Sequence, residues 1–246
     1  MLAVASSKIR ICEFFKIFLI ISKRRICPSE KLHGSIFISV SPGTDGITDS
    51  ECTTTGTAEP ASDEVVPDAN QYKYQKDELA AFCHFGPNTF NEVEWGEHYG
   101  KKQPNEIFTL TNDFDADTLV GTLHNAGFKK IIVTAKHHDG FCLFDSKLTD
   151  YKSTNTKAGR DLVREFVDAC REEGLKVGLY FSIIDWHHPD FPKYGDRQHP
   201  MRNNPAYKDE KIDFDRYLAY MHGQIKELVT GYGKLDLLWF DFSYDD

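Results

Sequence analysis

The sequence predicts a protein of the α/β class, in which parallel strands alternate with helices. From Leu79 onward, short apolar runs of strand length alternate with longer segments whose apolar residues recur at helical spacing. Glycines stand where the longer segments end, a position at which a helix often stops in the left-handed conformation. This alternation indicates consecutive βα units, in which each helix carries the chain back to begin the next parallel strand.

Four apolar runs are predicted strands, and three amphipathic segments between them are predicted helices. The strands cover residues 79–85, 130–135, 176–182 and 235–241, and the helices cover residues 115–125, 160–173 and 212–230. Together they make half of a (β/α)8 TIM-type barrel, so we expect about the first four βα units of that fold. Half a barrel leaves two sheet edges open, and we expect a longer chain to supply the missing strands.

Residues 1–70 differ in composition from the rest of the chain. Residues 41–70 contain seven acidic residues, no Lys or Arg, and many Ser, Thr, Gly and Pro. Such a segment cannot bury enough apolar surface to stay ordered by itself. We therefore predict a poorly structured, disordered leader with an acidic linker over residues 1–70, and the half-barrel over residues 71–246.

Overall composition argues for a soluble globular enzyme, with 40% apolar and 27% charged residues. The net charge of −9 argues against a nucleic-acid partner, because phosphate binding needs a basic face. The apolar run at residues 14–21 is far shorter than the roughly 20 residues that cross a bilayer, so no membrane span is expected. The six cysteines form no CxxC pair, which predicts neither a zinc ribbon nor a disulfide framework.

Catalytic groups of (β/α)8 barrels lie at the C-terminal ends of the strands, which directs attention to the polar residues there. Those residues are His84, then His137, His138 and Asp139, then Tyr180, Ser182 and Asp185, and lastly Asp241. Imidazole, aromatic and carboxylate groups together suit a sugar pocket. Tyr180 fits either a hydroxyl donor of that pocket or a residue that fills the barrel.

Asp241 follows the apolar run 237–240, so its carboxylate is expected at the floor of the pocket. There it stays ionised only if hydrogen-bond donors surround it. A retaining glycosidase uses such a carboxylate as its nucleophile, with a second acid about 5 to 5.5 Å away. The alternative is an aspartate at a strand end that caps the next helix.

The pair His137 and His138 follows a buried strand, so the two rings are expected to point in different directions and to donate to sugar hydroxyls. Two other interpretations stay open: a structural histidine pair, and a zinc site that includes His84. His84 by itself fits a core residue as well as a ligand. Glu94 and Trp95 lie in the loop after the first strand, where the indole can stack on a sugar or pack as a lid.

Several stretches together resemble family 29 of the glycoside hydrolases, the α-L-fucosidases. They are residues 84–86 (HFG), 136–141 (KHHDGF), 160–163 (RDLV) and 238–241 (LWFD). Each motif alone is weak, but KHHDGF followed by LWFD about a hundred residues later, on matching strands, is specific. The resemblance covers about residues 71–246.

The resemblance implies retaining hydrolysis of terminal α-L-fucose from fucosylated oligosaccharides or glycoconjugates, with no metal or organic cofactor. It implies that Asp241 is the nucleophile that forms the covalent intermediate. The positions that it implies for fucose binding are His84, Trp95, His137, His138 and Tyr180, with Glu94 as a less certain match.

The chain departs from the family in its first seventy residues and in stopping before the expected acid/base residue. We therefore expect little or no turnover of an aryl fucoside by these 246 residues, because one carboxylate cannot both attack and protonate. Two alternatives remain. One is a metal-dependent hydrolase on the same barrel, with His84, His137, His138 and Asp241 as ligands. The other is an inactive fucose-binding fragment.

Overall fold

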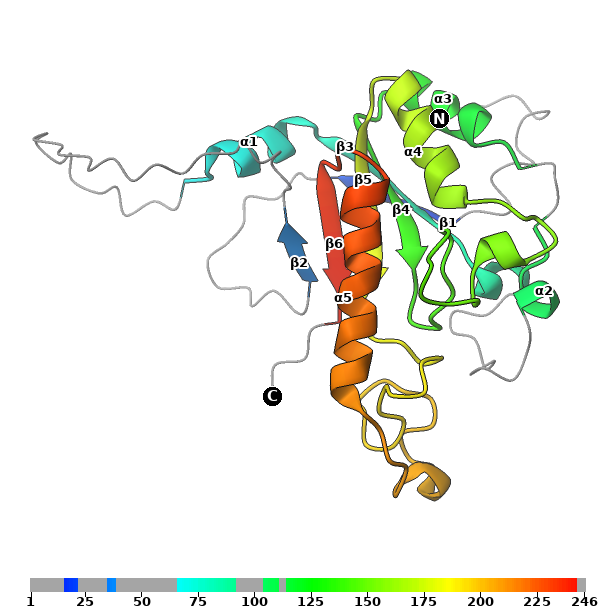
Figure 1. Ribbon diagram of the computed structural model, residues 1–246. Helices are drawn as coiled ribbons and strands as arrows, with labels where there is room; N and C mark the ends of the chain where they lie inside the picture. Colours follow the sequence, from blue (N-terminus) through cyan, green and yellow to red (C-terminus); the bar gives the residue numbers. More distant parts are fainter. Residues whose placement is uncertain (1–15, 22–34, 39–65, 92–103, 111–113, 243–246) are drawn as a thin grey trace, which may run out of the picture.

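The computed structural model describes residues 16–21, 35–38, 66–91, 104–110 and 114–242 of the chain. Within these residues, six strands form one sheet in the order β1-β3-β4-β5-β6-β2 (Figure 1). The strands are β1 (Lys16–Ile21), β2 (Ser35–Ile38), β3 (Leu79–His84), β4 (Lys130–Lys136), β5 (Lys176–Ser182) and β6 (Leu237–Asp241). Strands β3 to β6 are parallel neighbours, which confirms the α/β class with a parallel sheet.

The described helices are α1 (Ala69–Lys76), α2 (Pro104–Ile107), α3 (Ala116–Asn125), α4 (Leu162–Glu172) and α5 (Phe214–Gly231), with short 3-10 turns η2 (Pro87–Asn91), η3 (Ser153–Asn155) and η4 (Pro205–Tyr207). An aspartate precedes each of the three longest helices and accepts a hydrogen bond from a first-turn backbone N–H: Asp115, Asp161 and Asp213. Gly127 and Gly174 have φ of 93° and 68° just beyond α3 and α4, as expected for helix ends.

The predicted elements agree with the observed ones to within two residues at each end. The second strand extends to Lys136, one residue further than expected, and the fourth begins at Leu237 rather than at residue 235. The helices begin later than expected because the capping aspartates stand outside them. Apolar spacing therefore located each element of the parallel sheet and its helices.

The parallel sheet has two different faces because successive side chains of a strand point to opposite sides. One face is covered by helices and is called the outer face here. On it, Val133 and Leu179 belong to a large core that also contains Leu119 of α3, Phe166 of α4 and Leu228 of α5. The inner face carries a smaller cluster made of Phe82, Ile132, Tyr180 and Leu237, with Tyr74 and Trp239 packed against it. Helices thus cover the outer face, and the inner face leads up to the polar strand ends.

Strands β1 and β2 lie in the segment for which the sequence predicts little structure. They pair antiparallel with β3 and β6, the two edges of the parallel sheet. Backbone N–H and C=O groups at a sheet edge need partners, which accounts for strand formation by these two stretches. Residues 1–15, 22–34 and 39–65 lie outside the described residues, so a disordered leader and acidic linker remain predictions there. None of the helices in the described part of the chain has the length and apolar composition to span a membrane.

Candidate active site

Four parallel strands bring the predicted pocket residues to one edge of the sheet. The C-terminal ends of parallel strands all lie on the same side of the sheet, and β3 to β6 are neighbours there. In the register of β5 with β6, Ser182 stands beside Asp241 and Tyr180 beside Trp239. The pocket residues at these ends are His84 on β3, His137 and His138 after β4, Tyr180 on β5 and Asp241 on β6.

Both carboxylate oxygens of Asp241 accept hydrogen bonds. The Tyr180 hydroxyl donates to Oδ2 at 2.6 Å, and the backbone N–H of Phe242 donates to Oδ1 at 3.0 Å. Burial and the neighbouring Asp241 carboxylate raise the pKa of the Tyr180 hydroxyl, so this group stays protonated and remains a donor. Two donors stabilise the negative charge that a nucleophilic carboxylate must carry.

Three imidazole rings pack together beside Tyr180, the side chain that donates to this carboxylate. The ring centroid of His137 lies 4.5 Å from that of His84, 3.9 Å from that of His138 and 5.9 Å from that of Tyr180. His137 is thus the central ring, and the four side chains form one continuous cluster. This differs from the prediction that His137 and His138 point in different directions. Both residues lie beyond the last residue of β4, where the strict alternation of a strand no longer applies.

Hydrogen bonds fix the orientation of His138. Its Nδ1 lies 2.8 Å from Ser182 Oγ, and the Ser182 hydroxyl donates its only proton to the backbone carbonyl of Ile184, also at 2.8 Å. The shared contact therefore requires Nδ1–H of His138 as the donor, which leaves Nε2 as an acceptor. Sequence reasoning assigned both rings a donor role, and this network assigns His138 the opposite one.

Burial keeps two of the rings neutral. It lowers the pKa of His138 to about 3, with the nearby His84 and Lys136 adding to the effect. It also lowers the pKa of His137 well below its usual value, and His138 and His84 contribute. A neutral imidazole has one donor and one acceptor, which matches the hydroxyl groups of an uncharged sugar.

Glu94 and Trp95 fall outside the described residues, so their expected roles remain predictions. The metal-dependent alternative relies on His84, His137, His138 and Asp241 as ligands. Among the described residues, no three His, Cys, Asp or Glu side chains are grouped so that they could hold a metal ion. No described ligand set therefore favours that alternative.

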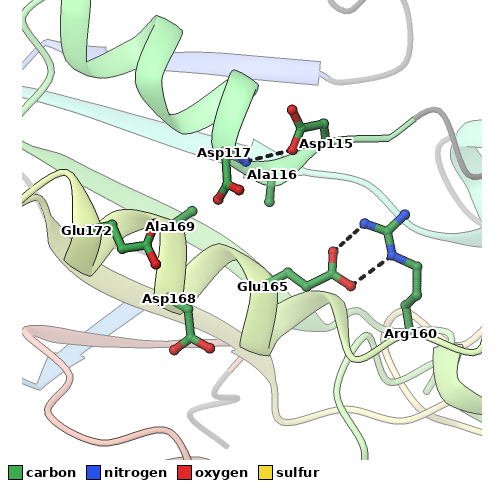
Figure 2. A pocket seen from close by; sticks show the side chains of 8 residues that line it. All are labelled: Asp115, Ala116, Asp117, Arg160, Glu165, Asp168, Ala169 and Glu172. Carbon is green, nitrogen blue, oxygen red and sulfur yellow. Dashed lines mark hydrogen bonds and ion pairs between the residues drawn. The ribbon is translucent and has the colours of Figure 1, made fainter.

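A hollow of about 380 Å³ lies between α3 and α4 (Figure 2). It is lined by Asp115, Ala116, Asp117, Arg160, Glu165, Asp168, Ala169 and Glu172. Arg160 is paired with Glu165 at its margin, and no aromatic ring lines it. A neutral sugar prefers aromatic faces and mixed donors and acceptors, so this acidic hollow fits it less well than the histidine cluster.

Comparison with known proteins decides the family. The model of the α-L-fucosidase family matches residues 48–246. The chain belongs to the α-L-fucosidase family. An α-L-fucosidase 1 of Arabidopsis thaliana is 36% identical over 184 residues, covering 74% of this chain and 32% of the plant protein.

Solved fucosidases agree with this assignment. An α-L-fucosidase isoenzyme 1 of Paenibacillus thiaminolyticus is 65% identical, with a TM-score of 0.53, and the match covers 54% of this chain and 32% of that one. A family 29 fucosidase of Ruminococcus gnavus, solved with fucose as a variant with one aspartate changed to alanine, is 50% identical, with a TM-score of 0.54 and coverage of 71% and 34%. This fucosidase-family chain thus spans about a third of the length of the relatives that it matches.

The pKa of Asp139 is raised in this fucosidase-family chain, a property that the sequence did not reveal. Its Oδ1 accepts the backbone N–H of Phe141 at 3.1 Å, and its Oδ2 accepts Asn88 Nδ2 at 3.2 Å. Burial raises the pKa of Asp139 to about 7, and the nearby Asp185 adds to the effect. The Asp-Gly turn was visible in the sequence, but its proximity to Asp185 depends on the folding of the loop after β5.

We expect Asp139→Asn to gain stability relative to the wild type as the pH rises from about 4 to 7. The folded state holds the Asp139 proton up to a pKa of about 7, whereas the unfolded state releases it near the ordinary value of 3.8. The stability from this group is therefore present below pH 3.8 and lost as the pH rises through 7. Thermal midpoints of both chains between pH 4 and 8 test this, and a constant difference across that range contradicts it.

Proposed function

We propose that this chain is the nucleophile-bearing part of a retaining α-L-fucosidase that hydrolyses terminal α-L-fucose from glycans. The observation that carries the proposal is the 2.6 Å hydrogen bond from Tyr180 to Asp241 beside the cluster of histidine rings. A carboxylate with two donors next to neutral hydrogen-bonding rings suits attack on an uncharged sugar. The fucose complex of the R. gnavus relative supports the choice of sugar.

In the proposed reaction, the Asp241 carboxylate attacks the anomeric carbon of fucose. A bond forms between the carboxylate oxygen and that carbon while the bond from the carbon to the leaving oxygen breaks. The leaving oxygen keeps the bonding electron pair and takes a proton from a second acid, which we assign to no described residue. A water molecule, losing a proton to the same group, then releases fucose with retained configuration and restores the carboxylate.

The described side chains supply binding and orientation in this reaction. His138 Nε2 accepts a hydrogen bond from a sugar hydroxyl, because its Nδ1–H is engaged with Ser182. His137 and His84 form the adjoining surface for further hydroxyls, with His84 held by the contact of its Nδ1 with Thr134 Oγ1 at 2.8 Å. Tyr180 holds the carboxylate in place as it attacks.

The same proposal includes the complete barrel. Strands β3 to β6 correspond to four of the eight strands of a (β/α)8 TIM-type barrel. The proposed pocket residues stand at the C-terminal strand ends, where barrel enzymes carry their catalytic groups. Sequence alternation, the parallel order and the outer helix layer support this larger architecture.

Titration of the 246-residue chain with L-fucose tests the sugar assignment. We expect L-fucose to shift the ring signals of His84, His137 and His138 in proton–nitrogen NMR spectra, with saturation. D-fucose, the mirror image, has the same polarity and is the control. Equal shifts with both sugars, or none with L-fucose, contradict the proposal.

We expect Tyr180→Phe to slow labelling of the chain by 2-deoxy-2-fluoro-fucosyl fluoride. This reagent carries a reactive leaving group, so its reaction with the nucleophile needs no general acid. A hydrogen bond to a charged group contributes about 1.5–3 kcal/mol, so loss of this donor should slow the reaction roughly tenfold to a hundredfold. Tyr217→Phe removes another buried hydroxyl, which donates to the backbone carbonyl of Ile183, and should leave the rate unchanged. Equal rates for the two variants count against the role of Tyr180.

A further inference from the structure

The end of β4 contains an irregularity that changes the direction of its side chains. The register with β5 pairs Thr134 with Tyr180, but it pairs Lys136 with Phe181, so two residues of β4 oppose one of β5. This is a β-bulge, a feature that re-aims side chains and occurs often beside active sites. In a regular strand Lys136 would lie on the same inner face as Ile132 and Thr134.

The bulge instead places Lys136 on the outer side of the sheet. Its Nζ lies 4.4 Å from the ring centroid of Phe181 and 5.6 Å from that of Tyr220 on α5. The same Nζ donates to Asp185 Oδ2 at 3.1 Å. Lys136 is 0% exposed and Asp185 is 1% exposed, so the ion pair is fully buried.

Asp185 connects this ion pair to the loop after β5. Its Oδ1 accepts the backbone N–H groups of His187 at 3.0 Å and His188 at 2.9 Å. The backbone N–H of Trp186, in the same loop, donates to the carbonyl of His138 at 2.8 Å. The pair therefore ties the turn that carries the pocket histidines to the end of the neighbouring strand.

We propose that the buried Lys136–Asp185 ion pair positions His137 and His138 by holding the bulge at the end of β4. If Lys136 returned to the inner face, the bulge would be lost and the residues after it would shift by one position relative to β5. His138 would then lose its contact with Ser182, and His137 would leave the cluster. The consequence for sugar binding rests on the proposed function, whereas the ring geometry does not.

A purely stabilising role explains the pair less well. Burial of two charges costs hydration energy that their attraction does little more than offset, and apolar replacements of such pairs are often neutral in stability. Buried ionic groups can instead specify one arrangement among several. Here the arrangement at stake is the register of the bulge and the direction of two imidazole rings.

The double variant Lys136→Met/Asp185→Asn tests the proposal in the 246-residue chain. Asparagine keeps an acceptor for the N–H groups of the loop, and methionine fills the space of the lysine. The matched control is Lys130→Met/Asp77→Asn, which removes a largely buried pair of 3.0 Å at the other end of β4 and, with it, the contact of Asp77 with Lys176. Thermal midpoints, histidine ring NMR signals and L-fucose affinity are measured for all chains.

We expect both double variants to fold and only the Lys136/Asp185 variant to lose the Nδ1–H signal of His138 and to bind L-fucose at least tenfold more weakly. A folded variant with wild-type histidine signals and affinity overturns the proposal. If the double variant does not fold, Lys136→Gln/Asp185→Asn is measured, because this neutral pair leaves no buried charge without a partner. Failure of both to fold also overturns it, since the pair would then serve the fold itself.

A wild-type chain that binds no L-fucose refutes the proposed function, while altered ring signals in the variant still support positioning.

Discussion

Asp241→Ala is expected to abolish the reaction of the chain with 2-deoxy-2-fluoro-fucosyl fluoride while L-fucose binding persists. Alanine removes the carboxylate that forms the covalent bond, so fluoride release should fall to the background rate. In the proposed site the histidine cluster binds the sugar independently of the Asp241 carboxylate, so the affinity for L-fucose should change only a few-fold. Fluoride release and equilibrium binding, measured on the same preparation, separate these two effects.

Asp168→Ala is a suitable control for this comparison. Asp168 is an exposed carboxylate on α4 that lines the acidic hollow, and it is not one of the predicted pocket residues. Its loss should leave both fluoride release and L-fucose binding unchanged. Wild-type fluoride release by Asp241→Ala would show that another group is the nucleophile.

Gly140→Ala is expected to cause the largest loss of stability among single substitutions at the site, roughly 3 kcal/mol or more. Gly140 has φ of 78°, a conformation that strains any residue with a Cβ. An added Cβ would also lie 2.2 Å from Asp185 Oδ1 and 2.9 Å from His187 Cβ. Strain and overlap act together here, and the overlap falls on the loop that the Lys136–Asp185 pair holds. Urea unfolding gives the change in free energy.

Gly195→Ala separates the two causes. Gly195 has a similar φ of 81°, but no atom lies within 4 Å of an added Cβ. Only backbone strain applies, and it should cost about 1–2 kcal/mol. If Gly140→Ala is no more destabilising than Gly195→Ala, the close approach of Asp185 to the turn is absent in solution.

The strands and helices of this fold were predictable because they depend on residues that are close together in the sequence. The strands are short runs of apolar residues, and α4 shows an apolar face from Leu162 to Cys170 that faces the core. Asp161 and Gly174 mark its two ends by capping chemistry that depends on neighbouring residues alone. Parallel order then follows from the alternation, which is why His84 and Asp241 were expected at the same edge.

Features that depend on contacts between distant segments were not predictable in the same way. The bulge at Lys136 brings its ammonium group to Asp185, which lies 49 residues further along the chain. The acceptor role of His138 depends on the bond from Ser182 to Ile184, which no spacing reveals. The pairing of β1 and β2 with the sheet edges required unpaired backbone at β3 and β6, a property of the folded sheet rather than of the leader.

Peptide mapping by mass spectrometry, after incubation of the wild-type chain with 2-deoxy-2-fluoro-fucosyl fluoride, tests the proposed fucosidase chemistry most directly. We predict one fluorofucosyl group per chain, attached to Asp241. A label on any other residue contradicts the assignment of the nucleophile, and so does an unlabelled chain that nevertheless binds L-fucose.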